Sequence, residues 1–147
     1  MNRLGTTFGG LVLAMSFFAC NSSKTPRFDE INFAALDEPC ACLEAAAVLY
    51  DHTSDLVLEI KHAADETRRR TNLGEPTSDA LLDSMLMLSE QMRAVLDGPG
   101  RELDRACKDV VDFDAVGQGM EGSDCSELAP FQRAFQRLRN IKEGVQP

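Results

Sequence analysis

The chain has little of several features on which common protein functions depend. It contains no tryptophan, one tyrosine and two histidines in 147 residues. It has no glycine-rich phosphate loop, no helical pair of histidines at metal-binding spacing and no serine in a nucleophile-elbow pattern. Apolar and polar residues nowhere alternate over more than a few positions, so β-strands are not indicated. These absences argue against familiar enzyme classes, and we expect a non-catalytic all-α protein without a cofactor.

Basic side chains are also scarce. Fifteen Lys and Arg stand against 24 Asp and Glu, which gives a formal net charge of −9 at pH 7. Binding to nucleic acid depends on Lys and Arg that neutralise phosphates, so this balance disfavours a nucleic-acid partner. An acidic surface would instead suit a basic protein partner.

One long apolar run is present, and it lies at the N-terminus. Residues 4–18 carry no ionisable group, follow a positive charge at Arg3 and lead through a small residue into Cys20. The run has the parts of an export signal but is shorter than the ~20 apolar residues that span a bilayer. The order Phe-Phe-Ala-Cys at residues 17–20 resembles the lipobox of bacterial lipoproteins. It departs from that pattern where the lipobox usually has Leu followed by a small residue and this chain has two phenylalanines.

The resemblance implies a lipid-anchored protein. In that family the cysteine thiol receives a diacylglycerol, the preceding peptide bond is cut, and the new amino group is usually acylated. Residues 1–19 would then be removed, and Cys20 would become the lipidated N-terminus, attached to the membrane. Residues 20–37 would link this anchor to a domain over 38–147. The alternatives are an ordinary secretory signal cut at the same place or an uncleaved anchor.

The residue after the cysteine bears on location. Asn21 follows Cys20, an order that in enteric bacteria looks like the default route to the outer membrane. We therefore expect a cell-envelope protein at the periplasmic or surface face of the outer membrane rather than at the inner membrane. Removal of Arg3 with the signal would leave a net charge of −10.

Four cysteines remain besides the predicted lipid-bearing one. Cys40, Cys42, Cys107 and Cys125 are an even number in an exported chain, which indicates two disulfides. A bond between Cys40 and Cys42 would close a strained ring across one intervening residue. We therefore expect each of these two to pair with Cys107 or Cys125, and both such arrangements stay open.

Four segments place apolar residues at steps of three and four, the spacing of a buried helix face. They predict helices from about 37–39 to 71–74, from 78–79 to 97, from 101 to 112–113, and from 127–130 to 142. Gly98-Pro99-Gly100 is expected to end the second helix, and residues 115–123, with three glycines, to form a flexible loop. The fold class is therefore all-α, a small up-and-down bundle of about four helices.

Two expectations concern packing. Four large apolar side chains between residues 28 and 36 are more than a solvated linker requires, so part of this segment should pack on the domain. In an antiparallel bundle the start of the first helix and the start of the third lie at one end. Cys40 or Cys42 can then meet Cys107 there.

Several soft ligands would suit Cu(I) if the thiols were free. They are Cys40, Cys42, Met85, Met87, Met92, His52 and His62. Two matching cysteines downstream favour disulfides instead, and two of the methionines fall on the apolar stripe of their helix. His52 and His62 lie ten residues apart, ~15 Å along a helix, and cannot share a metal. We assign no metal site.

Two charged patterns have plainer explanations. Residues 112–117 open like a calcium loop, but Val116 and Ser123 stand where the loop needs an oxygen donor and a bidentate Glu. We interpret this stretch as a helix end running into a loop. Arg68-Arg69-Arg70 closes the first helix, and we expect it to interact with Asp65 and Glu66 rather than with lipid head groups.

The sequence favours a non-catalytic envelope lipoprotein that binds another protein or supports an envelope assembly. The lipid anchor, the acidic surface and the lack of catalytic motifs carry this interpretation. Two alternatives stay open. One is a carrier of a small ligand or soft metal in a cavity between helices, and the other is a periplasmic inhibitor or immunity protein whose negative charge complements a basic enzyme.

The predicted anchor can be tested at one residue. Cys20→Ser removes the thiol that would receive the lipid, so we expect the variant to lose lipid labelling and to stay soluble or unprocessed. Intact mass spectrometry of the wild type should give a chain that starts at Cys20 and carries acyl groups. Ser23→Ala is the control and should be processed normally. Continued lipid labelling of Cys20→Ser would contradict the interpretation.

Overall fold

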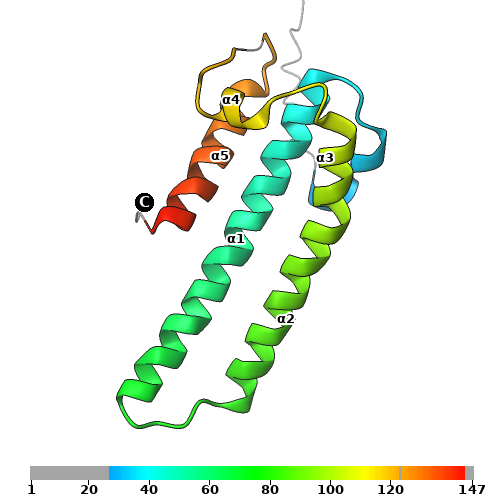
Figure 1. Ribbon diagram of the computed structural model, residues 1–147. Coiled ribbons are helices and arrows are strands. Elements are labelled where there is room, and N and C mark those ends of the chain that lie inside the picture. Colours follow the sequence, from blue (N-terminus) through cyan, green and yellow to red (C-terminus); the bar gives the residue numbers. More distant parts are fainter. Residues whose placement is uncertain (1–26, 123, 145–147) are drawn as a thin grey trace, which may run out of the picture.

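The computed structural model describes residues 27–122 and 124–144, and all regular structure in these ranges is helical (Figure 1). The predicted signal segment and Cys20 lie outside the described residues. The elements are η1 (Phe28–Glu30), η2 (Phe33–Ala35), α1 (Pro39–Asn72), α2 (Asp79–Val95), η3 (Leu96–Gly100), α3 (Arg101–Cys107), α4 (Phe113–Gly117) and α5 (Leu128–Glu143). The predicted fold class, an all-α up-and-down bundle with two disulfides, is confirmed.

Capping residues in the sequence determine where α1 begins and ends and where α2 begins. Pro39 occupies the first position of α1, where a missing N–H costs nothing. Past its end, Gly74 has a φ of +72°, the left-handed conformation that closes many helices and that glycine adopts without strain. The Ser78 hydroxyl then accepts a hydrogen bond from the Leu81 N–H and caps α2.

The prediction that Gly98-Pro99-Gly100 ends the second helix is wrong. Residues Leu96–Gly100 form a π-helical turn, η3, through which α2 continues into α3 in the same direction (Figure 1). Pro99 has no N–H to donate to the carbonyl four residues before it, and a wider turn accommodates that loss. A Cβ at position 100 would come within 3.2 Å of the Val95 carbonyl oxygen, which a glycine avoids. The helix then ends at Cys107 rather than at residue 112 or 113.

Residues 112–117 also differ from expectation, because part of the predicted loop is the short helix α4. A carboxylate oxygen of Asp112 accepts hydrogen bonds from the N–H groups of Asp114 and Ala115, at 3.1 and 3.0 Å. The first acid of the calcium-like pattern is therefore a helix cap. At the other end, a Cβ on Gly117 would lie 2.5 Å from the Phe135 ring, so only glycine lets α4 approach α5 this closely.

Polar side chains of α5 bind α4 through hydrogen bonds and α1 through ion pairs. Gln132 and Gln136 donate amide hydrogen bonds to the carbonyls of residues 116 and 117, at 3.0 and 3.1 Å. On another face, Arg137 pairs with Asp51 and Asp55 of α1, at 3.2 and 2.6 Å. These polar contacts surround an apolar interface, and they fix α5 to α1 and α4.

Both disulfides lie at the end of the bundle where α1 begins. Cys40 is bonded to Cys125, just before α5, and Cys42 to Cys107, the last residue of α3. Cys42 and Cys107 are fully buried. The expectation that Cys40 and Cys42 each pair with a downstream cysteine is confirmed. Cys107 reaches this end differently from the way predicted, since α3 ends there rather than beginning there.

The segment before α1 packs on the bundle, as its apolar content predicts. Phe33 is buried, and Phe28, Ile31 and Leu36 are partly buried against the core. The Phe28 ring also stacks on His52, with ring centroids 4.3 Å apart. The hydrophobic core therefore includes side chains from residues 28–36, before α1 begins.

The long hairpin of α1 and α2 extends past the end of α5 (Figure 1). On α2, Leu82 and Leu86 are 46% and 65% exposed. None of the helices in the described ranges is both long enough and apolar enough to cross a membrane.

Candidate binding cleft

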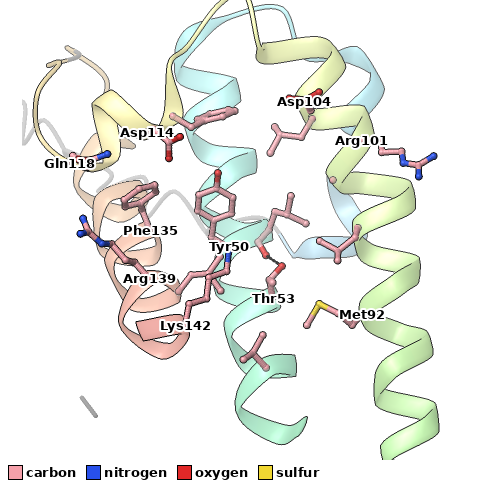
Figure 2. A pocket seen from close by; sticks show the side chains of 17 residues that line it. Tyr50, Thr53, Met92, Arg101, Asp104, Asp114, Gln118, Phe135, Arg139 and Lys142 are labelled. Carbon is pink, nitrogen blue, oxygen red and sulfur yellow. Dashed lines mark hydrogen bonds between the residues drawn. The ribbon is translucent and has the colours of Figure 1, made fainter. Parts of the chain in front are cut away.

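A cleft of about 820 Å³ opens where α5 and the continuous α2–α3 helix diverge over α1 (Figures 1 and 2). Its upper end is closed by α4. Apolar side chains from all of these helices line it: Leu49, Val57, Met92, Leu96, Leu103, Phe113, Phe135 and Leu138. The cleft is therefore a concave, mainly apolar surface with a few polar groups at defined places.

Tyr50 stands in the middle of the cleft. Its ring packs within a cluster of aromatic rings, with centroid distances of 5.7 Å to Phe131, 6.2 Å to Phe135 and 6.5 Å to Phe113. Its hydroxyl points toward α4, on the side where Asp114 lies (Figure 2). Burial of the ring, and then the negative charge of Asp114, raise the pKa of Tyr50 above its ordinary value. The hydroxyl therefore stays protonated and can donate a hydrogen bond.

Three cationic residues line the cleft, and two of them are neutralised. Arg101 pairs with Asp97 at 2.8 Å, and its guanidinium points away from the cleft (Figure 2). Arg139 pairs with Glu143, also at 2.8 Å. Lys142 makes no ion pair with any described residue, and its side chain extends from α5 toward Tyr50 and Thr53 (Figure 2).

The remaining polar groups lie mostly toward the opposite end. Asp114 lies in the first turn of α4, and Asp104 lies on α3 at the upper edge of the cleft (Figure 2). The Thr53 hydroxyl is buried and donates to the Leu49 carbonyl at 2.7 Å, so its proton is already used. The cleft therefore has an acidic end at α3 and α4 and a lysine at the C-terminal end of α5.

The soft ligands named from the sequence are not brought together. All four cysteines of residues 40, 42, 107 and 125 are in disulfides and present no thiolate to a metal. Met85 contacts Thr67, Met92 lines the cleft, and Met87 is exposed elsewhere on α2. Glu127 lies close to the Cys40–Cys125 sulfurs, but these are bonded to each other.

The expected pairing of the arginine run with Asp65 and Glu66 is confirmed. Arg69 and Arg70 both pair with Glu66, at 2.7 and 3.0 Å, and Arg68 pairs with Asp65 at 3.4 Å. Hydrogen bonds from Arg69 and then Arg70 lower the pKa of Glu66 to about 2. All three arginines therefore form ion pairs within the last turns of α1, two of them with the same carboxylate.

The polar residues of the cleft were not singled out as site residues by their sequence pattern. Tyr50 falls on the apolar stripe of its helix and is typical of a core position. Asp114 belongs to a calcium-like pattern that fails, and Lys142 is one of several cations on its helix. These three residues come together at the cleft only because α1, α4 and α5 pack against one another.

The state of Tyr50 can be measured directly, because the chain has one tyrosine and no tryptophan. In an alkaline titration followed by tyrosinate absorbance, we expect a pKa above the ordinary value of about 10 in the folded protein. Asp114→Asn should lower it only in part, since burial is the larger cause. Because the folded pKa is raised, the contribution of the neutral phenol to stability is complete below pH ~10 and is lost as the pH rises through the folded pKa. A folded protein that titrates at the ordinary value would contradict this environment.

No family model, curated protein or solved structure matches the chain. The function is accordingly inferred from the cleft and from the predicted anchor.

Proposed function

We propose that this protein is a lipid-anchored, non-catalytic carrier of the cell envelope that binds a small, largely apolar molecule in the cleft. The cleft is the observation that carries the proposal. Its volume of about 820 Å³ falls within the ~300–1,000 Å³ that is typical of small-molecule sites. Its apolar walls and few polar groups have the composition of such sites.

The position of the cleft would let a ligand contact several helices at once. The walls of the cleft are formed by α1, by the continuous α2–α3 helix and by α5, and α4 lies at one end. Both disulfides fix the ends of these elements relative to one another. A cleft held in this way is largely formed before the ligand arrives, which lowers the entropy lost on binding.

The anchor at Cys20 belongs to the same proposal. A lipid at the N-terminus keeps the domain at the membrane without any contribution from its surface, because two or three acyl chains bind a bilayer durably. The domain then needs no membrane-binding face, and its cleft stays available. A carrier that is anchored to a membrane could take up its apolar ligand from the bilayer or release it there.

A second candidate, binding of another protein, rests on the exposed leucines of α2. Leu82 and Leu86 lie on α2, are exposed and do not line the cleft. Exposed large apolar side chains of this kind are found at protein interfaces. The net negative charge would suit a basic partner, including an enzyme that the protein inhibits. The soft-metal alternative loses its thiolate ligands, since the cysteines are oxidised.

Two matched substitutions test the proposed carrier. Leu96 and Leu86 are both on the α2–η3 segment and are 54% and 65% exposed, but only Leu96 lines the cleft. Leu96→Trp should fill the cleft and lower the amount of co-purifying small molecule at least about tenfold. Leu86→Trp should leave that amount unchanged. The measurement is organic extraction of the purified full chain followed by mass spectrometry.

The comparison between the two variants excludes lipid that adheres to the anchor, because both variants keep the same N-terminus. Identical extracts from the wild type and Leu96→Trp would contradict a ligand in the cleft. Loss of a protein partner by Leu86→Trp alone, in crosslinked envelope fractions, would favour the second candidate.

A further inference from the structure

We propose that the ligand of the cleft is a free amphiphile with one apolar chain and an anionic head group, and that this head group binds the ammonium group of Lys142. The inference rests on the proposed function and specifies its ligand. It follows from which charges in the cleft are already matched and from where the unmatched ones lie.

Lys142 is the cation that is available to a ligand. Arg101 and Arg139 also line the cleft, but each has a carboxylate within 2.8 Å. Lys142 has no such partner among the described residues and extends into the cleft, toward Tyr50 and Thr53 (Figure 2). Lys142 is an exposed residue, so its ammonium group is accessible to an anion that enters the cleft from solvent.

The acidic end of the cleft gives the ligand a direction. Asp104 and Asp114 lie at α3 and α4, so an anionic head group is repelled from that end and attracted to Lys142 at the other. The Asp114 carboxylate lies on the side to which the Tyr50 hydroxyl points (Figure 2). The apolar side chains between the two ends, such as Leu49 and Leu103, would then contact the chain of the amphiphile.

An amphiphile explains the combination of features better than a fully apolar ligand does. A wholly apolar molecule would leave the Lys142 ammonium partly desolvated and unpaired, which is unfavourable. A cationic amphiphile would place like charges together at Lys142. An amphiphile with one anionic group would place that group at Lys142 and its apolar chain against the apolar side chains of the cleft.

Photocrosslinking tests the inference on the full chain in nanodiscs of neutral phosphatidylcholine. The probes are three 12-carbon chains that carry a terminal diazirine: the fatty acid, its methyl ester and the trimethylammonium counterpart. Adducts are mapped by peptide mass spectrometry. We expect the acid to label peptides that line the cleft and the other two probes to label them about tenfold less. Unlabelled dodecanoate should compete, whereas adding phosphatidylglycerol to the nanodisc should not.

Variants assign the effect to the lysine. Lys142→Ala should lower labelling of the cleft by the acid about tenfold, and Lys142→Arg should retain most of it. Lys108→Ala, at an exposed lysine just past α3 that does not line the cleft, is the matched control and should leave labelling unchanged. Because Lys142 also lies in the last turn of α5, circular dichroism melts of each variant check that the fold is kept.

The outcomes separate this inference from the function on which it rests. Equal labelling of the cleft by the acid and the methyl ester, or stronger labelling by the cationic probe, overturns the anionic head group and leaves a ligand-binding cleft standing. Competition by phosphatidylglycerol alone overturns the free amphiphile in favour of a membrane lipid. No labelling of the cleft by any probe, together with identical extracts from Leu96→Trp and wild type, overturns both.

Discussion

The first turn of α1 is tied twice to distant parts of the chain, and the rest of the structure depends on this constraint. Cys40 and Cys42, two residues apart, bond to cysteines 85 and 65 residues further on. Closing one loop of this length removes entropy from the unfolded chain worth about 4 kcal/mol, and the second bond adds less because the first already shortens the path between its cysteines. Because both bonds start in one helical turn, the end of α3 and the approach to α5 are brought to the same place.

The cleft follows from that arrangement. With α3 and α5 held at one end of α1, the two walls separate as they run along it, since α2 and α5 lie on different sides of the central helix (Figure 1). α4 fits between the tied ends and α5, where Gly117 allows the Phe135 ring to approach and two glutamines satisfy its carbonyls. The result is an apolar concavity with a closed upper end and a lysine at its lower one.

Much of this fold is predictable from local sequence, and the exceptions have physical reasons. The ends of α1 and α5 follow from apolar periodicity and from capping residues near them. The passage through Gly98-Pro99-Gly100 does not, because these residues usually end a helix. Here the disulfide of Cys107 and packing on α1 stabilise a helix that continues past these residues. The π-helical turn accommodates the backbone N–H that Pro99 lacks. α4 has five residues, too few for periodicity to reveal it.

From the sequence, the cleft is predictable only as a cavity between helices. Its polar residues Tyr50, Asp114 and Lys142 come from three different helices, and nothing in their local sequence connects them. The even number of cysteines predicts two bonds, and the single residue between Cys40 and Cys42 excludes a bond between them. Choosing between the other two arrangements required the path of α2 through η3 into α3.

Peptide mapping of the unreduced protein by mass spectrometry tests the central claim most directly. The account predicts two crosslinked peptide sets, one joining Cys40 to Cys125 and one joining Cys42 to Cys107. Cleavage between Cys40 and Cys42 distinguishes these from the exchanged arrangement. Bonds from Cys40 to Cys107 and from Cys42 to Cys125, or free thiols at any of the four positions in the folded protein, would contradict it.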